Sequence, residues 1–110
     1  MNSFLIMLEW EIEYNKVWCG DNGKISDTWG DEPDITLSDC QHRCFKEESC
    51  RFMFHGIDVW KDFRANRCAV FRACDDRTEY SPNDPTVYRP PFIGKAVILT
   101  SNIDISSLLA

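Results

Sequence analysis

Six cysteines are the residues best suited to do chemistry in this chain, as metal ligands, as nucleophiles or as disulfides. They are Cys19, Cys40, Cys44, Cys50, Cys68 and Cys74. Zinc sites usually combine two close pairs of Cys or His ligands, and only Cys40-x3-Cys44 would suit such a pair. The other cysteines would make a poor second one. We therefore predict disulfide bonds and expect neither a metal nor another cofactor.

Acid–base groups give little support to catalysis. The two histidines, His42 and His55, lie on different predicted elements. Three disulfides would leave no free thiolate for a Cys–His pair. Glu9, Glu11 and Glu13 share one exposed face of a predicted strand, whereas general acid–base catalysis needs carboxylates in different environments. We therefore predict that the chain is not an enzyme.

Composition narrows the classes of function. The 110 residues include 12 Lys and Arg and 18 Asp and Glu, which gives a formal charge of −6, and 44% are hydrophobic. This content favours one folded domain whose small core would gain stability from disulfides. A protein that binds nucleic acid or docks on an anionic membrane needs a basic surface instead. The charge therefore argues against both kinds of partner.

The elements that position the cysteines include one predicted helix, over residues 36–49. Two capping patterns compete for its start, Ser-x-x-Gln at 38–41 and Thr-x-x-Asp at 36–39. Cys40 and Cys44 would share one helical face, with Cβ atoms about 5–6 Å apart. Because a disulfide needs about 3.5–4.5 Å, these two should not bond each other. That leaves 12 of the 15 pairings that six cysteines allow.

Alternation of apolar and polar residues predicts three strands, each with one buried face. Their ranges and inward residues are 9–14 with Trp10, Ile12 and Tyr14; 50–54, packed under the helix, with Cys50, Phe52 and Phe54; and 67–72 with Cys68 and Val70. Asn22-Gly23 is the best signal for a tight turn. We expect a loop over 56–66, an irregular segment over 75–91 and a short strand over 96–100.

Three stretches that contain cysteines have a familiar spacing. They are Thr36-Leu37-Ser38-Asp39-Cys40-Gln41-His42-Arg43-Cys44, Cys50-Arg51-Phe52-Met53-Phe54 and Asn66-Arg67-Cys68-Ala69-Val70-Phe71. Together they resemble a PAN/Apple domain, in the variant found in protists and algae. The resemblance implies an α+β fold in which a helix with two cysteines packs on a small antiparallel sheet. It also implies disulfides between Cys40 and Cys68, between Cys44 and Cys50, and between Cys19 and Cys74.

The resemblance covers residues 19–74 and divides the chain into three parts. Residues 1–18 would be an N-terminal arm or strand, 19–74 the disulfide-stapled module, and 75–110 an irregular segment with a C-terminal arm. Both arms are markedly apolar, and we expect them to dock on partner proteins or to add strands to the module's own sheet. The arm residues predicted to bind partners are Phe4, Leu5, Leu8, Phe92, Leu108 and Leu109.

PAN-like modules bind proteins or carbohydrates through sites that differ between members, so no binding residue of the family transfers to this chain. Within the predicted loop, Trp60, Lys61, Phe63 and Arg64 form the best partner-binding patch, because Trp and Arg are enriched at binding hot spots. In the alternative reading, Trp60 and Phe63 close the open end of the small core.

Two functions follow as expectations. In the first, the chain is a non-catalytic structural or linker subunit of a larger, membrane-associated assembly. In the second, it is a secreted adhesion module for protein or carbohydrate ligands. No stretch approaches the roughly 20 apolar residues that cross a bilayer. Six cysteines indicate an oxidising compartment, either extracellular and secretory or an organelle lumen such as the thylakoid lumen of an alga. We expect a targeting peptide to have been removed.

Overall fold

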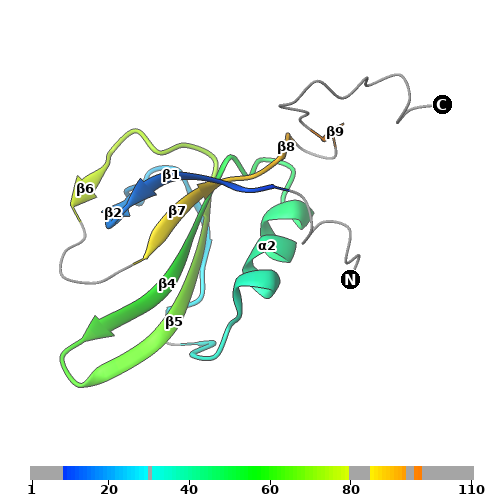
Figure 1. The fold of residues 1–110 in the computed structure, drawn as a ribbon. Coiled ribbons are helices and arrows are strands. Elements are labelled where there is room, and N and C mark those ends of the chain that lie inside the picture. Colours follow the sequence, from blue (N-terminus) through cyan, green and yellow to red (C-terminus); the bar gives the residue numbers. More distant parts are fainter. Residues whose placement is uncertain (1–8, 30, 80–84, 94–95, 98–110) are drawn as a thin grey trace.

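The computed structural model describes residues 9–29, 31–79, 85–93 and 96–97 and has an α+β fold. One helix, α2, packs against a five-stranded antiparallel sheet with the strand order β1-β7-β4-β5-β3 (Figure 1). The sheet strands are β1 (Glu11–Asn15), β3 (Lys24–Asp27), β4 (Phe52–Trp60), β5 (Phe63–Phe71) and β7 (Thr86–Arg89). Two small pairs accompany them, β2 (Val17–Trp18) with β6 (Thr78–Glu79) and β8 (Phe92–Ile93) with β9 (Ala96–Val97).

Helix α2 runs from Leu37 to Lys46, within the predicted range but three residues shorter at its end. Of the two predicted starts, the structure has the earlier one, because the Thr36 hydroxyl accepts a hydrogen bond from the Asp39 N–H at 3.1 Å. At the other end, the N–H of Glu47 donates to carbonyls of the last turn, which ends the helix. The predicted helix is therefore confirmed, with the start fixed by its cap.

The loop predicted over 56–66 is wrong, since these residues belong to a long hairpin formed by β4 and β5. All nine residues of each strand pair, and a two-residue turn at Lys61-Asp62 joins them. Gly56 interrupts the alternation of apolar and polar residues in the sequence. In the fold it does not end the strand but lets Pro85 come close to the backbone of β4. A Cβ on Gly56 would lie 2.6 Å from Pro85 Cα, so only glycine lets the start of β7 come this near.

The prediction of an irregular segment over 75–91 is also wrong in part. It contains β6 and β7, and β7 lies inside the sheet between β1 and β4. This strand has only four residues and is flanked by Pro85 and Pro90, which hid it in the sequence. Val87 in β7 is fully buried, so this short strand contributes directly to the core.

The N-terminal strand forms as predicted, but its three predicted inward residues do not share one buried face. Trp10 packs against the core on one side of the sheet and Tyr14 on the other, whereas Ile12 is 61% exposed. The pairing with β7 shifts register between Ile12 and Tyr14, which is the mark of a β-bulge. Because the bulge inserts Glu13 as an extra residue, the simple alternation of faces fails here.

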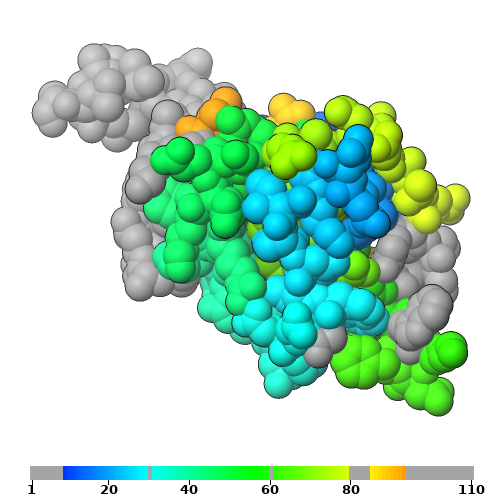
Figure 2. Space-filling view, turned by 180° about the vertical axis from the view of Figure 1, so that it is seen from behind, coloured from blue at the N-terminus to red at the C-terminus, as the bar shows by residue number. Residues whose placement is uncertain are grey.

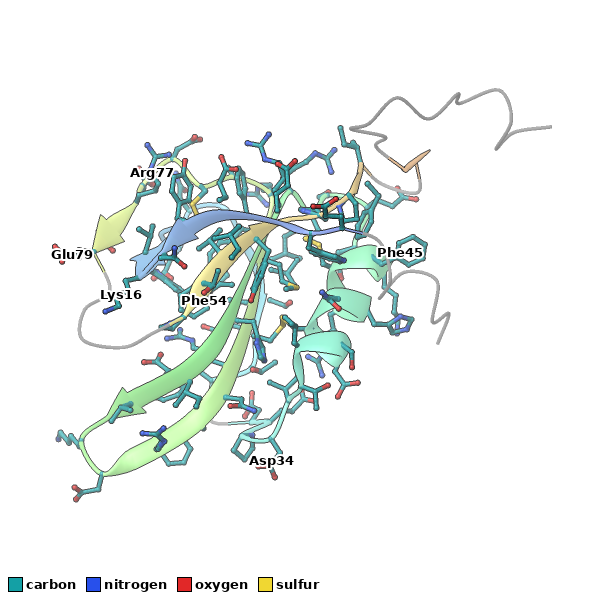
Figure 3. The ribbon with its side chains drawn as sticks, viewed as in Figure 1. Lys16, Asp34, Phe45, Phe54, Arg77 and Glu79 are labelled. Carbon is teal, nitrogen blue, oxygen red and sulfur yellow. A yellow bond between two sulfur atoms is a disulfide. The ribbon has the colours of Figure 1, made fainter. Side chains whose placement is uncertain are left out.

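The sheet is covered on both faces, so the core has two parts. On the helix side lie Ile35, Cys40, Cys44, Cys50, Met53, Cys68, Val70 and Phe92; on the opposite side lie Cys19, Phe54, Ala69, Phe71, Cys74 and Val87. Trp18 packs edge-on against Phe54 at 5.0 Å and thereby covers the opposite side. Figure 3 shows Phe54 in the middle of the molecule and Phe45 at the end of α2. The expectation that Cys50, Phe52 and Phe54 share a face is wrong, because Cys50, which precedes the strand, lies on the helix side and the two phenylalanines lie on the opposite side.

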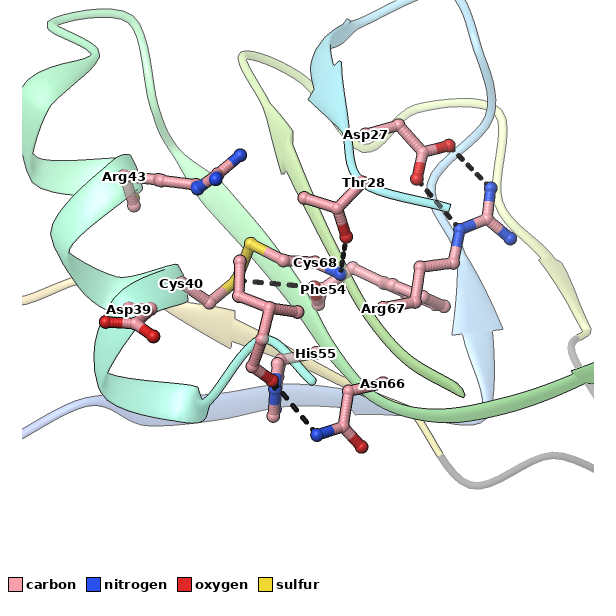
Figure 4. Close-up of a disulfide and its surroundings, with 12 residues drawn as sticks. Asp27, Thr28, Asp39, Cys40, Arg43, Phe54, His55, Asn66, Arg67 and Cys68 are labelled. Carbon is pink, nitrogen blue, oxygen red and sulfur yellow. Dashed lines mark hydrogen bonds and ion pairs between the residues drawn. A yellow bond between two sulfur atoms is a disulfide. The ribbon is translucent and has the colours of Figure 1, made fainter. Parts of the chain in front are cut away.

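Three disulfides hold these layers together: Cys19–Cys74, Cys40–Cys68 and Cys44–Cys50. They are the three pairs that the PAN/Apple resemblance implies. The Cys40–Cys68 bond joins α2 to β5 (Figure 4), and the Cys19–Cys74 bond lies on the opposite side of the sheet. All six cysteines are thereby bonded, which is consistent with an oxidising compartment.

Candidate functional site

The far part of the β4–β5 hairpin, residues 57–66, is the first candidate surface, and we call it the distal hairpin. It extends past α2 and forms a corner of the molecule (Figures 1 and 2). Ile57 is 42% exposed, Val59 39% and Phe63 44%, although they belong to the chain's longest strands. The helix ends short of this part of the sheet, which explains the exposure of Ile57 and Val59 on the face that α2 covers elsewhere. Phe63 is exposed on the opposite face.

The structure places three of the predicted patch residues, Lys61, Phe63 and Arg64, exposed on this surface. Phe63 and Arg64 are both exposed, and the Phe63 ring also contacts Trp29 edge-on at 5.3 Å. Lys61 lies in the turn at the tip of the hairpin and has a φ of 54°. The backbone of Trp60 pairs with Phe63, while the Trp60 side chain lies outside the described part of the structure.

Phe92, predicted to dock on a partner, is instead part of the core. It is 1% exposed and packs edge-on between Trp10, at 5.4 Å, and Phe45, at 5.2 Å. The C-terminal segment therefore begins by sealing the end of α2 rather than as a free arm. The other predicted arm residues, Phe4, Leu5, Leu8, Leu108 and Leu109, lie outside the described residues.

A buried ion cluster supports the base of the distal hairpin. The Arg67 guanidinium bonds both oxygens of Asp27, at 2.9 and 2.6 Å, and one oxygen of Asp58 at 2.9 Å. It also lies 4.3 Å from the centre of the Trp18 ring and 5.3 Å from that of Trp29 (Figure 4 shows the pair with Asp27). Because Asp58 is only 2% exposed, the cluster links β3, β4 and β5 in a region of low dielectric.

The electrostatic effect of this cluster is visible at Asp27. Burial desolvates the Asp27 carboxylate, which by itself would raise its pKa. The hydrogen bonds and the positive charge of Arg67, with the N–H of Trp29 and the ammonium of Lys24, outweigh that effect and hold the pKa below its ordinary value. Asp27 is therefore ionised and committed to structure rather than poised for proton transfer.

The two histidines lie on separate elements, as predicted, His42 on α2 and His55 on β4. The Nε2 of His55 donates to the Ile35 carbonyl at 3.2 Å, and that carbonyl also accepts from the Asn66 side chain. His42 Nδ1 is buried with no hydrogen-bond partner among the described residues. His55 thus anchors the segment that leads into the helix.

This position of His55 makes folding sensitive to pH. Burial lowers the pKa of His55, and the bond to Ile35 only partly offsets it. The unfolded chain therefore takes up a proton more readily than the native protein below about pH 6.5, and protonation favours unfolding. We expect the free energy of unfolding, measured with urea, to fall from pH 7.5 to pH 5.5. His55→Gln should flatten this dependence and His42→Gln should keep it. Equal slopes for His55→Gln and the unmodified protein would contradict this assignment.

A second candidate surface lies at the other end of the β4–β5 hairpin, and we call it the arginine groove. It is a hollow of about 320 Å³ whose lining includes Arg51, Arg72 and Arg89, with Asp75 as the one acidic residue. Arg51 precedes β4, Arg72 follows β5 and Arg89 ends β7, so the three lie at the ends of three adjacent strands. The groove brings together basic residues that are distant in the sequence.

Sequence reasoning missed both the ion cluster and the arginine groove. For the arginine groove, the sequence held only an indirect indication. Arg51 and Arg72 flank Phe52 and Phe71, and these two phenylalanines are paired in the sheet. Knowledge of that register would have placed the two arginines side by side. No local pattern indicated the position of Arg89, since β7 itself was not predicted.

Comparisons with known proteins add no family for this fold and these surfaces. No protein-family model, curated protein or solved structure matches the chain. In the described ranges, no group of three or more His, Cys, Asp or Glu residues is placed to hold a metal ion. The described helix is also too short and too polar to cross a membrane.

Proposed function

We propose that this chain is a non-catalytic, PAN/Apple-like binding module that serves as a small accessory or linker subunit of a larger protein assembly. The packing of a two-cysteine helix on an antiparallel sheet supports the PAN/Apple assignment, as do the three disulfide pairs. Its place of action is an oxidising compartment, secretory or lumenal. Contacts of the arm residues Phe4, Leu5, Leu8, Leu108 and Leu109 with partner proteins stay predictions.

The observation that carries this proposal is the distal hairpin. A small domain with three disulfides could fold without extending two strands beyond the helix that covers them. Ile57 and Phe63 lie on opposite faces of that extension and are both more than 40% exposed. An exposed aromatic beside Arg64 has the composition of a protein-binding hot spot. The partner is therefore a protein with an apolar surface that encloses the hairpin.

Native size in an extract tests this proposal. The tagged chain, expressed in its source organism and gently extracted, should elute from gel filtration well above its mass of 12.8 kDa. Ile57→Ser and the double change Phe63→Ala with Arg64→Ala should each shift it towards the free size. These positions are exposed, so the variants should stay folded, as circular dichroism would verify.

Ile12→Ser provides the matched control, because Ile12 is an equally apolar and even more exposed residue on β1. This variant should remain in the assembly. Elution of the unmodified chain as a free small protein would overturn the proposal. So would assembly that survives both hairpin variants. A dimer formed by the purified chain alone would show that the partner is a second copy, against a linker role.

The secreted adhesion module remains the second candidate function. The arginine groove favours it, because a hollow of this volume lies within the range of small-molecule sites, about 300–1,000 Å³. In that function the ligand binds at the groove, away from the distal hairpin.

A further inference from the structure

We propose that the arginine groove binds one acidic sugar residue, carrying a carboxylate or a sulfate, at the end of a glycan. The three arginines lie on the adjacent strands β5, β4 and β7. Neighbouring strands are about 4.8 Å apart, so the backbones of the three arginines lie within roughly 10 Å, and all three side chains line the same hollow. Positive charges that lie this close repel one another, and a bound anion would reduce that repulsion. The site is separate from the distal hairpin and does not depend on the function proposed for it.

The guanidiniums of Arg51 and Arg72 are positioned but not neutralised. Arg51 donates through one terminal nitrogen to the carbonyls of Glu48, at 2.9 Å, and Cys50, at 3.2 Å. Arg72 donates to the Asn22 carbonyl at 3.3 Å. Within the described residues, neither forms an ion pair with a carboxylate. Since a guanidinium has five N–H donors, both keep donors for the bidentate geometry that carboxylate and sulfate accept.

Arg89 is the third arginine of the groove, and its positive charge is partly neutralised by Glu13. One of its terminal nitrogens pairs with Glu13 at 3.0 Å, where both side chains are partly exposed. Its guanidinium carbon also lies 5.8 Å from the centre of the Phe52 ring. This contact fixes the cation over an aromatic that lines the same hollow. Arg89 therefore forms one wall of the groove, and an anion would contact chiefly the other two arginines.

Charge limits the ligand to a short one. The groove lining carries a formal +2, from three arginines and Asp75, whereas the whole chain carries −6. The rest of the chain therefore carries a formal charge of −8. Fields are screened within about 8 Å at physiological ionic strength, so an anion inside the groove is attracted mainly by its arginines. A long polyanion such as a nucleic acid would also meet the acidic remainder and be repelled.

The groove favours a sugar over an extended peptide. A peptide that adds a strand needs unpaired main-chain groups, but the N–H of Arg51 donates to Phe71 and that of Arg72 to Gly23, both at 2.8 Å. The remaining lining is apolar and includes Phe52 and the 51% exposed Ile93. A sugar ring offers apolar C–H faces to such residues, while its acidic group reaches the arginines.

Titration of the isotopically labelled, oxidised full chain, followed by NMR, tests the proposal. Methyl glucuronide and glucose 6-sulfate should shift the amide signals of Arg51, Arg72 and Phe52, whereas methyl glucoside at equal concentration should not. Arg51→Gln and Arg72→Gln should each weaken binding about tenfold, as expected for the loss of a charge-assisted pair. Lys46→Gln removes one positive charge from the exposed end of α2 and should leave the affinity unchanged.

Three results would overturn the proposal. The first is the absence of binding by both acidic sugars. The second is equal affinity for inorganic sulfate and glucose 6-sulfate, which would mean a simple anion site. The third is tighter binding of a capped diglutamate peptide, which would make an acidic protein segment the ligand. The hairpin variants should keep the sugar affinity and the arginine variants should keep the assembly, so this site and the protein contact can fail independently.

Discussion

Replacing Arg67 with methionine is expected to lower the free energy of unfolding by about 3–5 kcal/mol, the usual effect of breaking a buried ion pair from one side. Arg67 is the shared cation of Asp27 and of the almost fully buried Asp58. Its removal leaves two carboxylates in a region from which water is largely excluded. It also removes the cation that packs against the Trp18 ring. Urea unfolding at pH 7 would measure the loss.

Two further variants identify its cause. Arg64→Gln removes an exposed arginine three residues earlier on the same strand and should change stability by no more than about 0.5 kcal/mol. Adding Asp58→Asn to Arg67→Met should restore part of the loss, because the amide removes the charge of the more deeply buried of the two carboxylates. If the double variant were as unstable as Arg67→Met alone, lost packing rather than the unpaired carboxylate would be the cause.

Replacing both Cys19 and Cys74 with alanine is expected to cost about 4 kcal/mol, the largest loss among the three disulfides. The two cysteines are 55 residues apart, against 28 for Cys40 and Cys68 and 6 for Cys44 and Cys50. A longer closed loop restricts the unfolded chain more strongly, so the same double change at Cys44 and Cys50 should cost only about 2 kcal/mol. Urea unfolding of the oxidised proteins would give the order.

The position of the Cys19–Cys74 disulfide in the core should further increase the loss of stability when it is removed. Cys19 and Cys74 belong to the side of the sheet opposite the helix, where Trp18 is the main cover. Loss of their bond releases the segment that holds this tryptophan. Equal losses for the three double variants would contradict the loop-length argument. A near-zero effect at Cys19 and Cys74 would show that β2 and β6 stay in place without the bond.

The two candidate surfaces lie at opposite ends of one structural element. β4 and β5 have nine residues each, which corresponds to about 30 Å at the usual rise of a strand. The distal hairpin at one end and the arginine groove at the other could therefore be occupied at the same time. This arrangement suits a linker, because a protein partner and a glycan would not compete for the same atoms.

The site residues show why sequence reasoning reached one surface and missed the other. Phe63 and Arg64 lie within a few residues of each other, so composition alone drew attention to them. Arg51, Arg72 and Arg89 come from three separate strand ends, and each is unremarkable by itself. Only the antiparallel register of β4 with β5 and β7 brings them together. Long-range pairing of this kind has no local signal.

The sequence by itself determined the local features of this protein. Helix α2 and the shared face of Cys40 and Cys44 follow from spacing, because a helix has a fixed period. The sequence also limited the cap to Thr36 or Ser38, since a cap uses neighbouring residues. The turn at Asn22-Gly23 follows in the same way, and the Lys24 N–H bonds the Asp21 carbonyl across it. These features need no distant contacts.

The tertiary structure alone decided which faces and segments are buried. It covered both sides of the sheet, placed β7 between β1 and β4, left Trp10 and Tyr14 on opposite sides at a bulge and made Phe92 part of the core. Each outcome depends on a partner far along the chain, such as Pro85 against Gly56 or Trp10 against Phe92. A short apolar segment is stabilised only when it buries apolar area against another part of the chain, and that contact exists only in the folded protein.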